Sequence, residues 1–227
     1  MEYTDREYCI EVRGEMACFT RPELKVERVS YDVITPSAAR AIFEAILFKK
    51  GAMRWEITKI EVLNPIKWIS IRRNEVGAIA STTSPKPLLI EDKRQQRNSL
   101  MLRDVAYRLY AKLIFIPLVK RNPNDQSRQP GNDENPMKYY EMFERRVSKG
   151  QCFTQPYLGT RECAASWRWV QYFETEPQPI EKSSDFGIML YDMDFSDPKN
   201  ILAMFYRVRM DKGVIIVPPF NSEEIYR

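Results

Sequence analysis

Alternation between hydrophobic and polar positions predicts β-strands along the first half of the chain. Residues 8–12, 55–62 and 66–72 each predict one strand, and simple alternation places Trp55, Ile57, Lys59 and Glu61 on a single face. The clearest strand is 103–116. One of its faces is apolar and comprises Val105, Tyr107, Leu109, Ala111, Leu113 and Phe115. Its other face comprises Asp104, Ala106, Arg108, Tyr110, Lys112 and Ile114.

Two helices interrupt these strands. Thr35-Pro36 predicts a helix start, since threonine caps a helix and proline fits its first position. The apolar stripe that follows suits packing on a sheet and comprises Ala38, Ala39, Ile42, Ala45 and Ile46. Residues 136–149 predict the second helix. Residues 73–99 lack a hydrophobic period, and they predict a long loop of the functional or mobile kind.

The order of these elements indicates the fold class. A further strand is expected within 153–169, which gives strand, helix, strand, strand, helix and strand, with one extra strand in the middle. We therefore predict an α+β protein with a ferredoxin-like βαββαβ domain of the RNA-recognition-motif type at 1–171. Residues 172–227 predict a small C-terminal antiparallel β-sheet appended to that domain, with a hairpin turn at Asp211-Lys212-Gly213.

Composition excludes several classes of site. The 227 residues include four cysteines without a C-x-x-C pair, and no histidine, so the usual zinc ligand sets and Cys–His or Ser–His nucleophile pairs are ruled out. The acidic residues are scattered, and we expect neither a metal nor another cofactor. A highly charged N-terminal segment and the lack of a long apolar run predict a cytoplasmic protein with reduced thiols and no membrane partner.

Charge is distributed unevenly. The net charge is only +4, but residues 54–121 hold fourteen Lys and Arg against six Asp and Glu. Such a concentration is expected for a protein that binds a polyanion. RNA is the partner we favour and duplex DNA is an alternative, while a charged face that is merely solvated would show the same composition.

The mixed face of strand 103–116 offers candidate chemistry. Arg108, Tyr110 and Lys112 would project together from the side of the sheet that no helix covers, and these side chains suit phosphates and stacked bases. Cleavage of RNA without a metal needs groups that move protons. Lys112 could transfer a proton or stabilise phosphate, with Tyr110 as its partner.

Several segments together resemble a known family. They are 18–23 (CFTRPE), 25–40 (KVERVSYDVITPSAAR), 61–66 (EVLNPI), 71–76 (IRRNEV), 102–107 (LRDVAY) and 158–163 (LGTREC). In these segments the sequence resembles the CRISPR-associated type I-C repeat-processing endoribonucleases, the d subtype of the fifth Cas family. The resemblance extends over nearly the whole chain.

This resemblance implies a function. Members of the family cut CRISPR precursor RNA beside the repeat hairpin without metal, and then hold the 5′ handle of the guide RNA within a surveillance complex of several subunits. On this chain we expect the RNA-binding side chains to be Arg21, Lys25, Arg28, Arg72, Arg73, Arg103, Arg108 and Arg161.

The catalytic residues of the family are only partly matched. Family nucleases use a tyrosine at the end of the first helix and a lysine–histidine pair near the strand at 103–116. Leu47 stands at the tyrosine position and Lys112 at the histidine position. Three alternatives follow: Tyr110 and Lys112 substitute, cleavage is weak, or the protein only binds RNA. Tyr31 is a further catalytic candidate.

Overall fold

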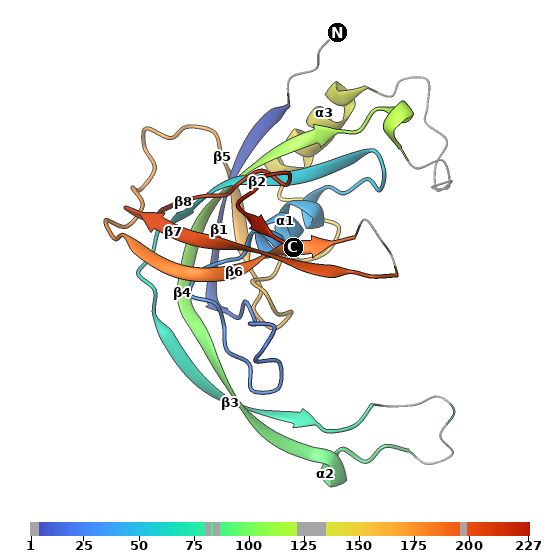
Figure 1. Ribbon diagram of the computed structural model, residues 1–227, viewed down its shortest axis with the longest axis vertical. Helices are drawn as coiled ribbons and strands as arrows, with labels where there is room; N and C mark the ends of the chain where they lie inside the picture. The colour runs from blue at the N-terminus through green and yellow to red at the C-terminus, as the bar shows by residue number, and fades with distance from the viewer. Residues whose placement is uncertain (1–4, 80–82, 84–86, 122–134, 196–198) are drawn as a thin grey trace.

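The computed structural model describes residues 5–79, 83, 87–121, 135–195 and 199–227. In chain order its elements are β1 (Arg6–Ala17), α1 (Pro36–Ile46), β2 (Met53–Val62), β3 (Trp68–Val76), α2 (Ile90–Lys93), β4 (Arg94–Phe115), η1 (Leu118–Lys120), α3 (Pro136–Ser148), β5 (Ser166–Val170), β6 (Ser184–Asp194), β7 (Leu202–Asp211), β8 (Val214–Ile216) and β9 (Ile225–Tyr226). The protein is thus a mixed α/β structure dominated by one sheet (Figure 1).

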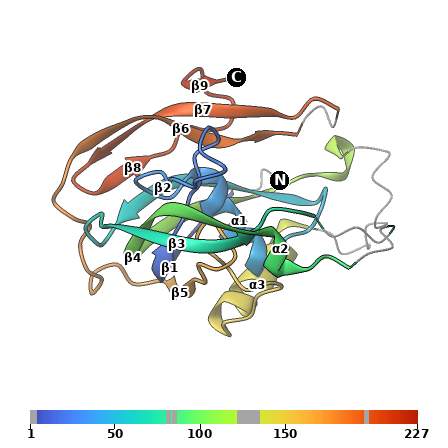
Figure 2. The same ribbon diagram turned by 90° about the horizontal axis from the view of Figure 1, so that it is seen from below.

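The sheet has the strand order β5-β1-β4-β2-β8-β7-β6, and every pair in it is antiparallel. Strand β3 pairs with β4, and β9 pairs with β7. Helix α1 contacts both β2 and β6, because the sheet curls around it (Figure 2). Helix α3 packs near β4 and β5, and both helices contribute to the same hydrophobic core.

Helix α1 begins where the sequence predicts. The Thr35 hydroxyl accepts a hydrogen bond from the Ala38 amide at 3.3 Å, and Pro36 occupies the first turn. Phe43 belongs to an aromatic cluster that lies between the helices and the sheet and also contains Tyr8, Trp55 and Phe143. The predicted apolar stripe divides: Ala39, Ile42 and Ile46 are buried, whereas Ala38 and Ala45 are only half-buried.

Strand β2 departs from simple alternation. A bulge between Ile57 and Lys59 adds one residue and reverses the faces beyond it. Ile60 and Val62 therefore enter the core with Trp55 and Ile57. The prediction that Lys59 and Glu61 share a face with Trp55 is wrong, because the bulge turns both side chains toward the other side of the sheet, beside Tyr110 and Arg108.

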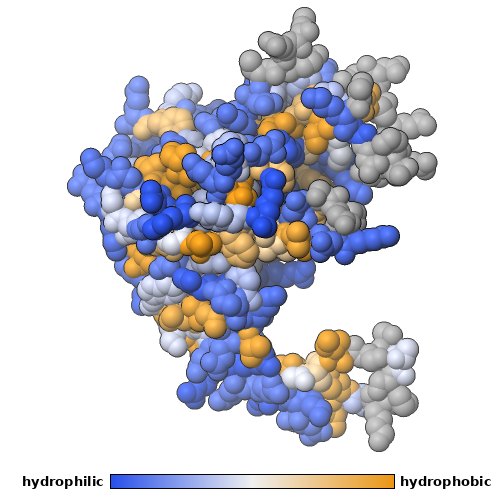
Figure 3. Space-filling view, viewed as in Figure 1, coloured by the Kyte–Doolittle hydropathy of each residue, from blue (hydrophilic) through white to orange (hydrophobic). Residues whose placement is uncertain are grey.

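Both ends of the predicted loop at 73–99 belong to paired β-strands. Strand β3 pairs with the first part of β4, from Trp68 opposite Leu102 to Val76 opposite Arg94, and not with β2. We call this pair of segments, 68–76 and 94–102, the arm; it extends away from the body of the protein (Figure 1). Much of its surface is hydrophilic (Figure 3), so its strands carry little of the hydrophobic alternation that would predict them.

The C-terminal strands continue the main sheet. Strand β8 pairs with β7 on one side and with β2 on the other, and the expected turn at Lys212-Gly213 joins β7 to β8 with positive φ at both residues. One hydrophobic cluster includes residues from both halves of the chain, among them Ile60 and Met204. No helix within the described residues has the length and apolar character that crossing a membrane requires.

Candidate nucleic-acid interface

Arg108 lies on the face of the sheet that α1 and α3 leave uncovered, but it is not free there. We call this face, formed by β1, β2, β4 and β5, the outer face. Residues 171–183, which join β5 to β6 and which we call the strap, pass over part of it. Arg108 is 4% exposed, donates a hydrogen bond to the Pro177 carbonyl, and lies 3.3 Å from the Glu61 carboxylate. The prediction that Arg108 projects from an open surface is therefore wrong.

Tyr110 is covered by the same strap. The tyrosine is 7% exposed, and its ring stacks on Phe173 with centroids 5.9 Å apart and an angle of 16° between planes. The Lys59 ammonium lies 3.7 Å from the centre of the Tyr110 ring. Burial, followed by the nearby Cys9 and Glu61, raises the pKa of Tyr110. At neutral pH the phenol is therefore protonated and a weak proton donor.

Carboxylates offset the positive charge of the outer face. Lys112 is exposed, but it lies opposite Glu7 on β1 and Glu56 on β2. Arg108 is flanked in the same way, by Glu11 and Glu61. Directly opposite residues of an antiparallel pair share one face of the sheet, so each cation here has acidic neighbours. The outer face is consequently not a basic surface.

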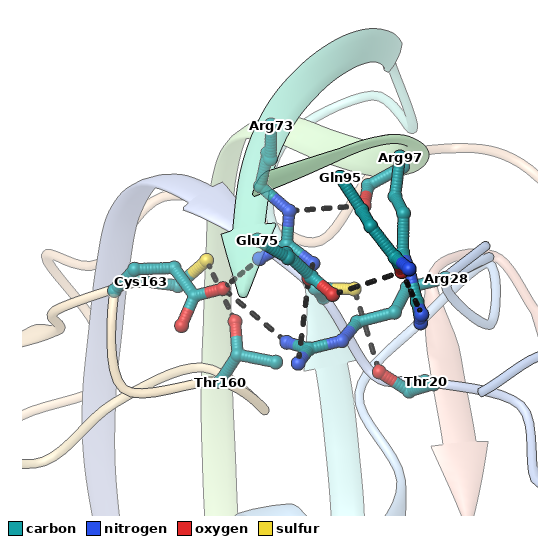
Figure 4. Close-up of polar contacts among 11 residues, drawn as sticks. Thr20, Arg28, Arg73, Glu75, Gln95, Arg97, Thr160 and Cys163 are labelled. Atoms are coloured by element: carbon teal, nitrogen blue, oxygen red, sulfur yellow. Dashed lines mark hydrogen bonds and ion pairs between the residues drawn. The ribbon is translucent and has the colours of Figure 1, made fainter. Parts of the chain in front are cut away.

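One side of the arm is arranged differently (Figure 4). Arg28, Arg73 and Arg97 converge on Glu75 and Glu162, and we call these five residues the arginine cluster. The Glu75 carboxylate lies 2.9 Å from Arg73, 3.7 Å from Arg97 and 3.9 Å from Arg28. Glu162 pairs with Arg73 and lies 3.4 Å from Arg28. Three cations share two anions, so the cluster has a net positive charge.

Three segments distant in sequence form the arginine cluster. The loop carrying Arg28 is attached to the arm by two backbone hydrogen bonds, from Leu100 to Arg28 at 2.8 Å and from Ser30 to Leu100 at 2.9 Å. A turn closed by the hydrogen bond from the Cys163 amide to the Thr160 carbonyl, 2.9 Å, presents Glu162. Backbone contacts therefore hold these side chains together before any ligand binds.

The other predicted side chains are exposed, half-buried or buried in the core. Arg21 is half-buried, pairs with Asp32 at 3.1 Å, and lies 4.8 Å above the Tyr31 ring. Tyr31 itself is buried, and this burial raises its pKa, which disfavours it as a proton carrier at neutral pH. The exposed predicted cations are Lys25, Arg72, Arg103 and Arg161.

Leu47 and Lys112 lie in different environments. The Leu47 side chain belongs to the core, and its carbonyl accepts a hydrogen bond from the Trp55 indole at 2.9 Å. Lys112 is exposed on the outer face. Within the described residues, no three His, Cys, Asp or Glu side chains gather as a metal site requires.

Sequence reasoning missed part of the arm. Arg97 joins the arginine cluster because it lies directly opposite Arg73. The other side of the arm is an exposed polar ribbon, which includes Arg72, Asn74, Arg94, Gln96 and Asn98. A strand pair outside the core has no hydrophobic periodicity, which is the main sequence signal for a strand. The sequence therefore offers little indication that residues 73–76 and 94–99 are strands.

The chain is similar to known proteins over nearly its whole length. Residues 7–218 match the family Cas_Cas5d, described as CRISPR-associated protein (Cas_Cas5). A protein of Mannheimia succiniciproducens named CRISPR pre-crRNA endoribonuclease Cas5d is 43% identical over 96% of this chain and 97% of its own length. A protein of the same name from Thermus thermophilus is 40% identical over 96% of this chain and 94% of its own length.

Solved structures share the fold. A structure described as a CRISPR-associated protein has a TM-score of 0.70 at 23% identity, with both chains fully covered. A chain of a CRISPR RNA-guided surveillance complex has a TM-score of 0.54 at 11% identity, covering 95% of this chain and 92% of that one. The family match over nearly the whole length and the two relatives lead to one conclusion: the chain belongs to the Cas5d family of CRISPR-associated proteins.

Proposed function

We propose that this protein is a metal-independent endoribonuclease that cleaves CRISPR precursor RNA at the repeat hairpin and then stays bound to the 5′ handle of the guide RNA. Its full-length relatives, each named a CRISPR pre-crRNA endoribonuclease, support the activity. The observation that carries RNA binding is the arginine cluster, in which three guanidinium groups converge from separate segments.

The arginine cluster suits RNA phosphates because its cations are already gathered. An arriving phosphate can replace Glu75 or Glu162 as the partner of a guanidinium group, so the ion pairs exchange and the arginines need little reorganisation. The exposed cations Arg103 and Arg161 would extend the contact along the backbone, and Arg72, on the other side of the arm, would contact a separate stretch of the RNA. Arg21 and Lys25 border the same loop as Arg28 and belong to the proposed interface.

For the chemistry we propose Lys112 as the group that stabilises the phosphate. Its ammonium is exposed, and it can contact phosphate without movement of the strap. A role for Tyr110 as its partner requires displacement of Phe173, which covers the ring. Tyr31 would require similar exposure, since it is buried beneath Arg21.

Cleavage of repeat RNA in the presence of EDTA tests this proposal. We expect wild-type protein to cut the repeat beside its hairpin under these conditions. Lys112→Ala should cut at least about tenfold more slowly if the ammonium stabilises the transition state. Arg209→Ala removes an exposed cation from β7 and should cut at the wild-type rate. Equal rates for wild type and Lys112→Ala contradict the role of Lys112.

A second candidate function is a subunit that binds guide RNA without cutting it. The burial of Tyr110, and the leucine at the position of the family tyrosine, favour this alternative. It predicts tight, salt-sensitive binding of repeat RNA with no product in the cleavage assay. Uncut RNA in the presence of tight binding therefore selects this function over the first.

Partners beyond RNA also belong to this proposal. One chain of similar fold comes from a CRISPR RNA-guided surveillance complex, which supports other subunits of such a complex as partners. Duplex DNA is a further candidate, because a two-stranded ribbon can enter a major groove and the exposed side of the arm carries Arg, Asn and Gln side chains. Competition between repeat RNA and duplex DNA for the protein distinguishes these ligands.

We also propose a finer description of the fold. The order β5-β1-β4-β2, with α1 after β1 and α3 after β4, supports a ferredoxin-like domain at 1–171 into which the arm is inserted. Residues 172–227 would then be an addition that extends the sheet through β8. Expression of 1–171 alone tests this division, since it leaves the β2 edge unpaired.

A further inference from the structure

A cavity of about 580 Å³ opens between α1 and residues 153–159. Its floor is formed along α1 by Ala38, Ala41 and Ala45, which lie on one side of the helix at spacings of three and four. Because these side chains are small, they leave room between the helix and the loop that faces it. The cavity is therefore a consequence of alanine at three successive turns.

Aromatic side chains form the walls of this cavity. Phe48, Phe153 and Tyr157 all line it, and all three are exposed, Phe153 to 84%. Exposed apolar groups that gather around one hollow mark a binding site more often than single ones do. Hydroxyl groups also line it, those of Thr20 and Thr154 among them, so the walls offer flat apolar faces and hydrogen-bonding edges.

The cavity and the arginine cluster are formed in part by the same two loops. Thr20, which lines the cavity, forms an isolated β-bridge with Ser30, two residues from Arg28. Gly159 lies at φ +87°, and a Cβ atom there would come within 2.0 Å of the Cys18 carbonyl oxygen. Only glycine permits this approach, and the turn around it contains Tyr157, which lines the cavity, and Glu162, which belongs to the arginine cluster.

We propose that this cavity binds one unpaired nucleobase of the RNA whose phosphates contact the arginine cluster; the inference rests on the proposed function. Unpaired bases are recognised by stacking on aromatic side chains and by hydrogen bonds to their edges, and the walls provide both kinds of group. The neighbouring guanidinium groups favour RNA over an apolar peptide, which has no phosphates to place against them. The Glu44 carboxylate at the rim is paired with Arg40 at 2.5 Å.

Phe153→Ala tests the proposal in the full-length protein with repeat RNA as the probe. Loss of one base–aromatic stack should raise the Kd by about 5- to 100-fold. Tyr172→Ala is the matched control, because Tyr172 is an aromatic residue on the strap that is 78% exposed and does not line the cavity. Its Kd should equal that of wild type. Since Phe153 projects into solvent, both variants should keep the wild-type unfolding temperature.

A double-mutant cycle, which combines a protein substitution with a change in the RNA, identifies the bound base. Repeat RNAs in which one nucleotide outside the hairpin is made abasic are compared on wild-type and Phe153→Ala protein. One abasic position should weaken binding to wild type and have no further effect on Phe153→Ala, since both changes remove the same stack. Additive losses at every position overturn the proposal.

Other outcomes are equally informative. Wild-type affinity in both Phe153→Ala and Tyr157→Ala overturns the nucleobase site while leaving RNA binding by the arginine cluster intact. A defect confined to association with another protein also overturns it, because an apolar peptide is then the occupant. Failure of the wild-type protein to bind repeat RNA overturns the proposed function, and this inference with it.

Discussion

Two arginines of the same strand, Arg97 and Arg108, lie in contrasting surroundings. Arg108 is buried under the strap, with Glu61 beside it and the Pro177 carbonyl as its hydrogen-bond partner. Arg97 lies in the arginine cluster, where cations outnumber carboxylates. Both arginines belong to the most basic part of the sequence. A local excess of positive charge therefore indicates a polyanion partner without locating the surface that binds it.

The difference lies in what an arriving phosphate would have to displace. In the arginine cluster it exchanges with a half-exposed carboxylate that water already reaches. At Arg108 it would have to remove the strap and then lie beside Glu61, which is 7% exposed. Desolvation and like-charge repulsion both oppose that second process. RNA binding is accordingly expected on the side of the arm that carries the arginine cluster.

The largest predicted effect is on protein stability, at the buried Arg108. Arg108→Ala removes the donor to the Pro177 carbonyl and one of the two cations beside the buried Glu61 carboxylate, leaving Lys59 at 2.9 Å, and should lower the free energy of unfolding by about 3 kcal/mol. Lys112→Ala, on the same strand face but exposed, should change it by less than about 0.5 kcal/mol. Urea unfolding measures both variants. Equal stability of the two would show that Arg108 is not held as described.

On the other side, the arginine cluster should control RNA affinity. Arg28→Ala with Arg73→Ala should weaken binding of repeat RNA by about 10- to 100-fold and reduce the salt dependence by about two phosphate contacts. Arg207→Ala with Arg209→Ala is the matched control, since these arginines also share one carboxylate, that of Asp185. Titration at several salt concentrations compares the pairs. An equal loss of RNA affinity in both double variants would show that the arginine cluster contributes no more than any other pair of exposed arginines.

The sequence predicted the parts of the fold that contact the core. Strand 103–116 and the start of α1 follow from hydrophobic alternation and from Thr35-Pro36, because burial and capping act through those side chains. The arm was missed because neither of its faces is fully buried along most of its length. The bulge in β2 was missed because the residue types between Ile57 and Lys59 do not indicate that one extra residue interrupts the alternation.

The candidate site was predictable in its members more than in its geometry. In the arginine cluster, Arg28 and Arg73 were identified from segments that resemble a known family, whereas Arg97 was not. The cover over Arg108 could not be foreseen, since its hydrogen-bond acceptor is the backbone carbonyl of Pro177, far along the chain. Because every residue has a backbone carbonyl, the identity of the residue at position 177 does not indicate this contact.

A smaller effect should follow from loosening the strap. Phe173→Ala removes the ring stacked on Tyr110 and should cost about 1 kcal/mol in unfolding free energy. Burial raises the pKa of Tyr110, so exposing the phenol should move that pKa back toward its ordinary value. Spectrophotometric titration of tyrosine follows the change. Tyr172→Ala on the same strap should leave the titration of Tyr110 unaltered. An equal pKa shift in that control would show that the effect does not depend on the stacking of Phe173 on Tyr110.

The smallest predicted effect concerns the ion pair that anchors the strap. Arg168, through its hydrogen bond, lowers the pKa of Glu176, so this pair stabilises the folded protein above the ordinary glutamate pKa of about 4.3. The contribution is lost as the pH falls through the lowered pKa of the folded state, because the unfolded chain binds the proton more readily. Glu176→Gln removes the titrating group. Below the ordinary glutamate pKa of about 4.3, the unfolding free energy of this variant should therefore fall less steeply with decreasing pH than that of wild type. Glu174→Gln, two residues away and exposed, should retain the wild-type slope. Since water reaches the pair, the change in slope should be slight, and identical slopes for wild type and Glu176→Gln would mean that Phe173 and Pro177 hold the strap without it.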